Sequence, residues 1–181
     1  MDKNEFRPAH INSKLDSGLL YLHEHAPRTS WIDLQGAAAF WLGVHHSLRR
    51  RHTELERLGA AFLDKQTDWA DYRMQTLYTA AHHLGNLHSH HHVEDNSYFP
   101  RLRRQEPKLC RGFDLLDSDH EDIEGRLKNW EKLIGELKVT TWENRDLAAR
   151  LHQSFTDSSD CLMRHLSDEE DLVIPVLALY S

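Results

Sequence analysis

The strongest constraint in this sequence is the spacing of its apolar residues, which recur at steps of three and four over four long segments. That period places them on one face of an α-helix, and alternating strand patterns are absent. Such segments, joined by short loops, predict an all-α fold in which four helices pack up-down-up-down around one core. The predicted helices span residues 30–64, 68–98, 112–138 and 140 onwards.

Two short patterns predict where helices begin. Ser30 with Asp33, and Thr140 with Glu143, have the spacing of a capping box, in which a hydroxyl and a carboxylate satisfy the first backbone N–H groups. Residues 1–29 are less regular, and we expect them to form an N-terminal extension that packs on a bundle of residues 30–181.

Length and composition exclude several classes of protein. A chain of 181 residues can bury one sizeable core, and no apolar run approaches the roughly 20 residues of a membrane span. A net charge of −7 at pH 7 argues against non-specific nucleic-acid binding. Cys110 and Cys161 are too few for a disulfide scaffold, and the polar N-terminus is unlike a signal peptide. We therefore expect a cytoplasmic protein without nucleic-acid or membrane partners.

Each apolar stripe carries a histidine where leucine is expected, and these histidines belong to an internal repeat. Two segments 75 residues apart both read H-x-x-x-E-[D/E]-x-x-x-x-P-x-L, and the other two histidines are also 75 residues apart. The pattern indicates two helical hairpins related by a pseudo-two-fold axis, each with a lone histidine and an H-x-x-x-E pair. The residues are His45, His90 and Glu94 in the first hairpin and His120, His165 and Glu169 in the second.

The chemistry of this set points to metal ions. Residues four apart on a helix lie on the same face about 6 Å apart, so each H-x-x-x-E pair aims an imidazole and a carboxylate at one place. A lone histidine in a stripe is usually a hydrogen-bonded core residue, but two buried carboxylates at one level are destabilising unless paired or metal-bound. Bridging glutamates with two histidines per ion, and an oxo or hydroxo bridge, leave an open position on each metal. This nitrogen and oxygen set suits iron or manganese better than structural zinc, which prefers closed tetrahedral sites.

The flanking residues resemble those of the hemerythrin-like (HHE cation-binding) family over residues 35–178. The segments that carry the resemblance are VHHSLR (44–49), HHHVEDNSYFP (90–100), DSDHEDI (117–123) and HLSDEEDLVIP (165–175). The resemblance implies a four-helix bundle with a non-heme di-iron centre that binds or reacts with O2, NO or peroxide. Oxygen-carrying members have a second histidine four residues after the third-helix histidine, whereas here Glu124 follows His120. Simple O2 transport is therefore not expected. Glu124 is either an additional ligand or acceptor, or a surface partner of Arg126 or Lys128.

The remaining histidines divide into two groups. His46, His82, His88, His91 and His92 fall off the inward stripes. Among these, His91 is expected to orient the ligands together with Asp95, as outer partners commonly do. His52 lies seven residues after His45 and His83 seven before His90, so on antiparallel helices these two should meet about 10 Å from the metals. We expect a hydrogen-bonded histidine layer there, a candidate proton or ligand path rather than a second metal site.

The leading functional prediction is a non-heme dinuclear iron protein that binds or reacts with O2, NO or peroxide. Sensing, an oxidase or peroxidase activity, and detoxification or repair of iron centres all remain open, and no catalytic residue is identified. The first alternative is a structural or storage bundle that binds zinc or manganese without redox turnover. The second is a helical interaction module without metal.

Overall fold

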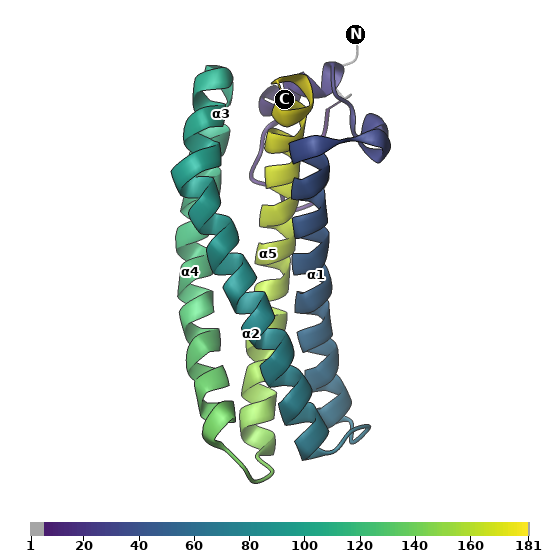
Figure 1. Ribbon diagram of the computed structural model, residues 1–181, viewed down its shortest axis with the longest axis vertical. Coiled ribbons are helices and arrows are strands. Elements are labelled where there is room, and N and C mark those ends of the chain that lie inside the picture. Colours follow the sequence, from purple (N-terminus) through teal and green to yellow (C-terminus); the bar gives the residue numbers. More distant parts are fainter. Residues whose placement is uncertain (1–5, 181) are drawn as a thin grey trace. The chain divides into compact units, whose positions relative to one another are not determined.

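The computed structural model describes residues 6–180, and within that range the chain is helical and has no β-strand. Figure 1 shows the arrangement of the α-helices along the chain. These are α1 (Gly36–Leu63), α2 (Trp69–Val93), α3 (Phe99–Gln105), α4 (Cys110–Val139) and α5 (Arg145–Tyr180). The shorter elements are the 3-10 helices η1 (Ser17–Glu24), η2 (Arg28–Asp33) and η4 (Pro107–Leu109), and the π-helix η3 (Glu94–Tyr98). The predicted all-α class is confirmed; residues 1–5 of the predicted extension, and Ser181, lie outside the described residues.

The predicted capping box at Ser30 is wrong, because α1 begins only at Gly36. The Ser30 hydroxyl donates to the carbonyl of Pro27 at 2.7 Å, so it is not available to cap a helix. Gly36 has a φ of 62°, a left-handed conformation that glycine adopts without steric cost, and this turn redirects the chain into α1.

The second predicted capping box is also wrong. The Thr140 hydroxyl donates to the carbonyl of Glu136 at 2.8 Å and so closes the end of α4. Asn144 caps α5 instead, since its side-chain oxygen accepts the N–H of Leu147 at 3.0 Å. Asparagine is as good an N-cap as serine or aspartate. The helix therefore begins at Arg145, five residues after Thr140.

The described residues form two compact units, each built from several chain segments. The first unit contains residues 6–46, 91–121 and 162–180, and the second contains residues 47–90 and 122–161. Each of α1, α2, α4 and α5 contributes to both units. None of the described helices combines the length and apolarity needed to cross a membrane.

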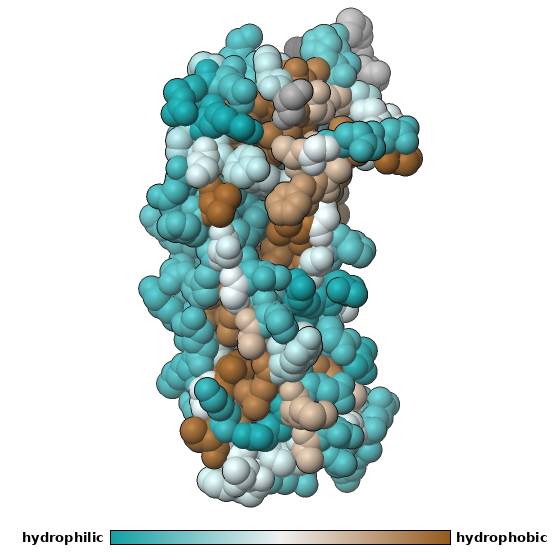
Figure 2. All heavy atoms as spheres, viewed as in Figure 1, coloured by the Kyte–Doolittle hydropathy of each residue, from teal (hydrophilic) through white to brown (hydrophobic). Residues whose placement is uncertain are grey.

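The core of the first unit joins the N-terminal segment to the helices. Leu20 of η1 is completely buried, and it belongs to the same apolar cluster as Trp41 of α1, Phe113 of α4 and Ile174 of α5. Full burial of one leucine contributes about 1.5 to 3 kcal/mol, so the extension is an integral part of this core. Hydrophilic side chains cover most of the face in Figure 2, and apolar side chains show only in smaller patches.

Aromatic rings fill the core of the second unit. Phe62 stacks on Tyr72 with ring centroids 4.7 Å apart, next to Trp69. Trp130 packs against Phe155 at 5.0 Å. Trp130 also packs against the buried rings of His52 and His83, and Phe155 against that of His52.

Candidate metal centre

Six buried side chains of the first unit belong to groups that could hold a metal ion. Four of them, two histidines and both glutamates, have no exposed surface, and the other two histidines are 7% exposed. They come from α1, α2, η3, α4 and α5, and they are His45, His91, Glu94, His120, His165 and Glu169. Buried carboxylates are costly unless they are compensated, so this gathering requires a chemical reason.

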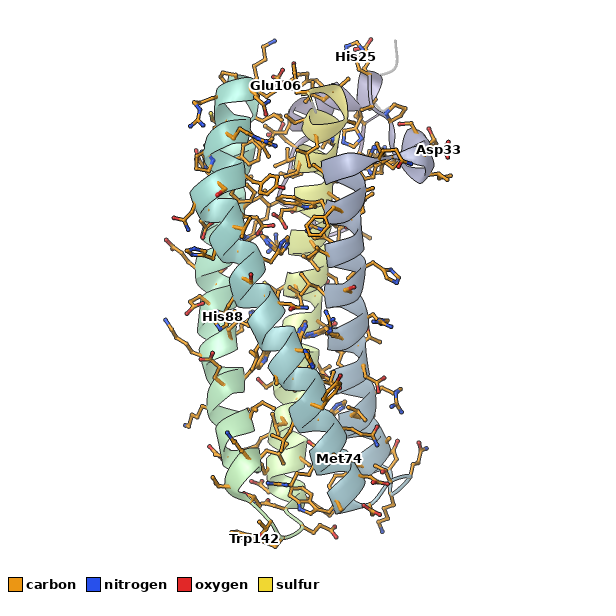
Figure 3. All side chains as sticks on the ribbon, viewed as in Figure 1. His25, Asp33, Met74, His88, Glu106 and Trp142 are labelled. Atoms are coloured by element: carbon orange, nitrogen blue, oxygen red, sulfur yellow. The ribbon has the colours of Figure 1, made fainter. Side chains whose placement is uncertain are left out.

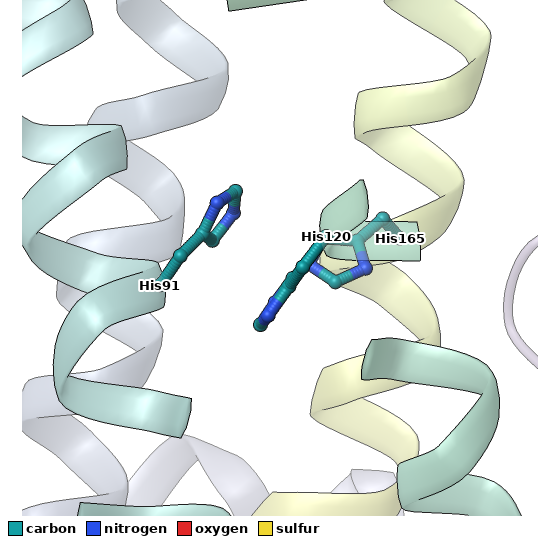
Figure 4. Close-up of side chains that lie close together, drawn as sticks. All are labelled: His91, His120 and His165. Carbon is teal, nitrogen blue, oxygen red and sulfur yellow. The ribbon is translucent and has the colours of Figure 1, made fainter. Parts of the chain in front are cut away.

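Three imidazoles form the first group. The ring of His91 stacks on that of His120 at 4.1 Å, and His165 meets His120 edge-on at 4.9 Å. One nitrogen of each ring lies within 4.8 Å of the other two. Figure 4 shows the three rings approaching one another from separate helices. Three convergent imidazole nitrogens are a common ligand set for transition metals.

The second group consists of His45, Glu94 and Glu169, whose ligand atoms also lie within 4.8 Å of one another. Its carboxylates approach the first group as well. The Glu94 Oε2 atom is 3.5 Å from Nε2 of His120, and the Glu169 Oε2 atom is 3.5 Å from Nε2 of His165. Glu169 Oε2 is also 3.3 Å from Nε2 of His45. Both carboxylates therefore lie between the first group of imidazoles and His45.

These distances fit metal ligation. Two donor atoms that are each about 2.0–2.2 Å from one ion, at tetrahedral or octahedral angles, lie roughly 3.0–3.5 Å from each other. The imidazole-to-carboxylate separations of 3.3 and 3.5 Å fall in that range. They are long for charge-assisted hydrogen bonds, which are about 2.7–2.9 Å. The donor set is therefore arranged as ligands around cations are arranged.

The outer nitrogen of three imidazoles faces a carboxylate. Nδ1 of His45 is 2.9 Å from Glu170, and Nδ1 of His120 is 2.8 Å from Asp95. Nδ1 of His165 lies 3.5 Å from Asp119, slightly beyond a well-formed hydrogen bond. A carboxylate at Nδ1 favours a proton there and leaves Nε2 free to bind a metal. Burial lowers the pKa of His165, which keeps this ring in the neutral form that ligation requires.

His91 is the residue that the sequence analysis misplaced, because it is buried rather than off the inward face. His91 lies in the regular part of α2, four residues after the buried Leu87, and residues four apart share a helix face. The backbone changes to a π-helix only at Glu94, and such turns are frequent at functional sites. A usable signal was present, since His91 precedes Glu94 by three residues and spacings of three also share a helix face.

The other predicted ligands, His90 and Glu124, belong to the second unit. His90 lies on α2 one turn before Glu94, in the part of α2 that belongs to the second unit, and its ligand role stays a prediction. The Glu124 side chain is 43% exposed and 3.4 Å from Lys128. This is the surface pairing considered as the alternative, and a solvated ion pair does not favour Glu124 as a ligand. His88 is likewise exposed, 3.0 Å from Glu131 (Figure 3).

His52 and His83 meet inside the second unit, as their spacing predicted. Nδ1 of His52 is 3.3 Å from Nε2 of His83, and Nε2 of His52 donates to the carbonyl of Phe155 at 3.0 Å. Because Nε2 of His52 carries the proton, its Nδ1 accepts a hydrogen bond from Nε2 of His83. The hydrogen bonds therefore run in one direction, from His83 to His52 and from His52 to the carbonyl of Phe155. Burial lowers the pKa of His52 to about 4 and that of His83 to about 3. Both rings are therefore neutral near pH 7.

Comparisons with known proteins agree with this chemistry. No curated protein and no solved structure matches the chain. A family description, the hemerythrin HHE cation binding domain, matches residues 37–177, which include every buried histidine and glutamate of the candidate centre. The chain belongs to the hemerythrin HHE cation-binding domain family.

Proposed function

We propose that this protein holds two iron ions between its helices and that the centre binds or reacts with O2, NO or peroxide. The proposal rests on one observation: Glu94 and Glu169, both without exposed surface, lie between the first group of imidazoles and His45 at distances typical of shared metal ligands. Neighbouring helices in the family's four-helix bundle supply ligands to such centres from their inward faces.

The ligand sets of the two proposed ions are unequal. His91, His120 and His165 serve one ion, and His45 with His90 serves the other, while both glutamates bridge. The first ion then has five protein ligands and the second has four, so the second has more room for an external ligand. Imidazole and carboxylate donors with open positions favour iron or manganese over structural zinc, which prefers closed tetrahedral sites.

The surrounding residues prepare the site for small ligands. The ring centroids of Phe99 and His120 are 5.6 Å apart, and those of Trp41 and His45 are 5.9 Å apart. Aromatic rings therefore cover both ends of the ligand set and exclude bulk water. Bound iron supplies the electrons and the open coordination positions at which a diatomic molecule or peroxide binds. The chain itself orients the imidazoles of His120 and His45 through Asp95 and Glu170.

The test is to load metal-free protein with Fe(II) without oxygen and then mix it rapidly with O2, NO or peroxide. We expect two iron ions per chain and new near-ultraviolet charge-transfer absorption after oxidation, with no such change in zinc-loaded protein. Stable binding of zinc or manganese together with indifference to all three reagents would instead support a structural or storage role.

Replacing His91 with alanine is expected to lower the iron content below two ions per chain after gel filtration. The first ion loses one of its three imidazoles and binds less tightly, while the ligand set of the second ion is unchanged. Metal analysis after gel filtration measures this directly. His92→Ala is the matched control, since His92 is the next residue on α2 and is exposed beside Asn96. Equal iron content in both variants would remove His91 from the ligand set.

A further inference from the structure

The N-terminal segment attaches to α5 at a place created by Pro175. Proline has no N–H, so the carbonyl of Asp171, four residues earlier, receives no helical hydrogen bond. Nε2 of His23 donates to that carbonyl at 2.8 Å, and His23 is only 4% exposed. The histidine thus satisfies a buried acceptor that the helix leaves open. Figure 1 shows this segment beside the end of α5.

The side chain of Asp171 holds the same segment. Its Oδ2 accepts the backbone N–H of Ala9 at 2.8 Å, and its Oδ1 accepts Nε of Arg28 at 2.7 Å. Farther along, the Tyr21 hydroxyl donates to Glu106, which also accepts from Tyr180 at 2.7 Å. Charge-assisted hydrogen bonds of this kind are stronger than neutral ones, so the segment is fixed in place at several points.

Lys14 extends this attachment towards the candidate metal centre. Its backbone N–H donates to Asp168 Oδ2 at 3.0 Å, and its ammonium donates to Asp119 Oδ1 at 2.5 Å. The Lys14 side chain is 39% exposed, whereas that of Asp119 is 1% exposed. A partly solvated cation of the extension therefore reaches a carboxylate that is buried within the first unit.

Asp119 connects Lys14 to a ligand histidine. Arg164 donates to both of its oxygens, at 2.6 and 2.9 Å, and Oδ2 faces Nδ1 of His165 at 3.5 Å. Lys14 therefore holds Oδ1, the oxygen of Asp119 that does not face His165.

We propose that Lys14 is a positioning residue for the metal centre: by holding Asp119 it orients His165, so the N-terminal segment determines how firmly the centre retains its metal. The inference rests on the proposed function, because it assumes that His165 is a ligand. Residues that orient a ligand imidazole commonly change metal affinity by about 10- to 100-fold when replaced. Lys14 contacts Asp119 and not His165 itself, so its replacement is expected to lower metal affinity by about 10-fold.

The experiment follows release of iron from Fe(II)-loaded protein into an excess of a coloured chelator. Lys14→Met is expected to release iron about 10-fold faster than the wild type, and Asp119→Asn faster still. Lys14→Arg should restore slow release, because a guanidinium can also donate to Asp119. Lys108→Met is the matched control, since the Lys108 ammonium lies over the Tyr21 ring, 5.5 Å from its centroid.

A second comparison separates positioning from simple tethering. Arg28→Met loosens the same segment at Asp171 and leaves the Lys14–Asp119 contact in place. If Arg28→Met accelerates release as much as Lys14→Met, the segment acts only as a tether and the positioning role is wrong. Identical release from wild type and Lys14→Met also overturns the inference while leaving the proposed centre intact. Failure of the wild-type protein to bind iron at all contradicts the proposed function instead.

Discussion

Replacing both Glu94 and Glu169 with alanine is expected to abolish metal binding and the stability that metal confers. A ligand that binds only the folded state stabilises it by about 4 kcal/mol when its concentration is 1,000 times the dissociation constant. Saturating Fe(II) should therefore raise the free energy of unfolding of the wild type by about that amount for each bound ion, and leave the double variant unchanged. Urea titrations with and without Fe(II), performed without oxygen, measure both values.

The metal-free proteins provide the complementary comparison. Removing two carboxylates that have no exposed surface eliminates buried charge, and this gain offsets the loss of side-chain packing. The metal-free double variant should thus be at least as stable as the metal-free wild type. Glu121→Ala is the control, because Glu121 follows His120 on α4 and is exposed. Equal stabilisation of wild type and double variant by Fe(II) would show that these glutamates are not ligands.

The second large effect concerns His52 and His83 at acid pH. The pKa of each is lowered by burial, to about 4 and about 3, whereas in the unfolded chain both titrate near 6.5. Between these values the unfolded state binds protons that the folded state does not, so stability falls as the pH decreases. Protonation of these two residues in the unfolded chain should lower the free energy of unfolding by about 4 kcal/mol between pH 7 and pH 5.

The measurement compares urea unfolding of metal-free protein at pH 7 and pH 5. In a variant with His52→Leu and His83→Leu this part of the pH dependence should disappear, since leucine binds no proton in either state. Other buried histidines, such as His165, contribute equally to both proteins. A control variant with His46→Leu and His82→Leu, at exposed positions, should retain the wild-type slope. An unchanged slope in the His52 and His83 variant would mean that the pair is not buried in neutral form.

The helices and most of the site were predictable because period and repeat are properties of the sequence itself. The spacing of three and four residues indicated the helices, and the offset of 75 residues singled out His45, His120 and the two H-x-x-x-E pairs. The meeting of His52 and His83 followed from the same geometry. These predictions needed only the rise per residue of an α-helix.

The errors arose where spacing alone does not show which face or contact a side chain takes. Ser30 has the right spacing for a cap, but its hydroxyl donates to the carbonyl of Pro27, a competitor that spacing does not reveal. His91 was placed off the inward face, although it is buried in the regular part of α2 that precedes the π-helix. The two copies of the repeat share a sequence pattern, yet His23 donates a hydrogen bond only to a carbonyl of the second copy, that of Asp171.

The central claim is that two cations lie between Glu94 and Glu169, and anomalous diffraction at the iron edge from crystals of Fe-loaded protein tests it most directly. Two peaks roughly 3.5–4 Å apart, each within bonding distance of both carboxylates, are expected. One group of imidazoles, which includes His165, should contact the first peak, and His45 should contact the second. A single peak, or side chains of Glu94 and Glu169 turned away from the density, would contradict a bridged pair.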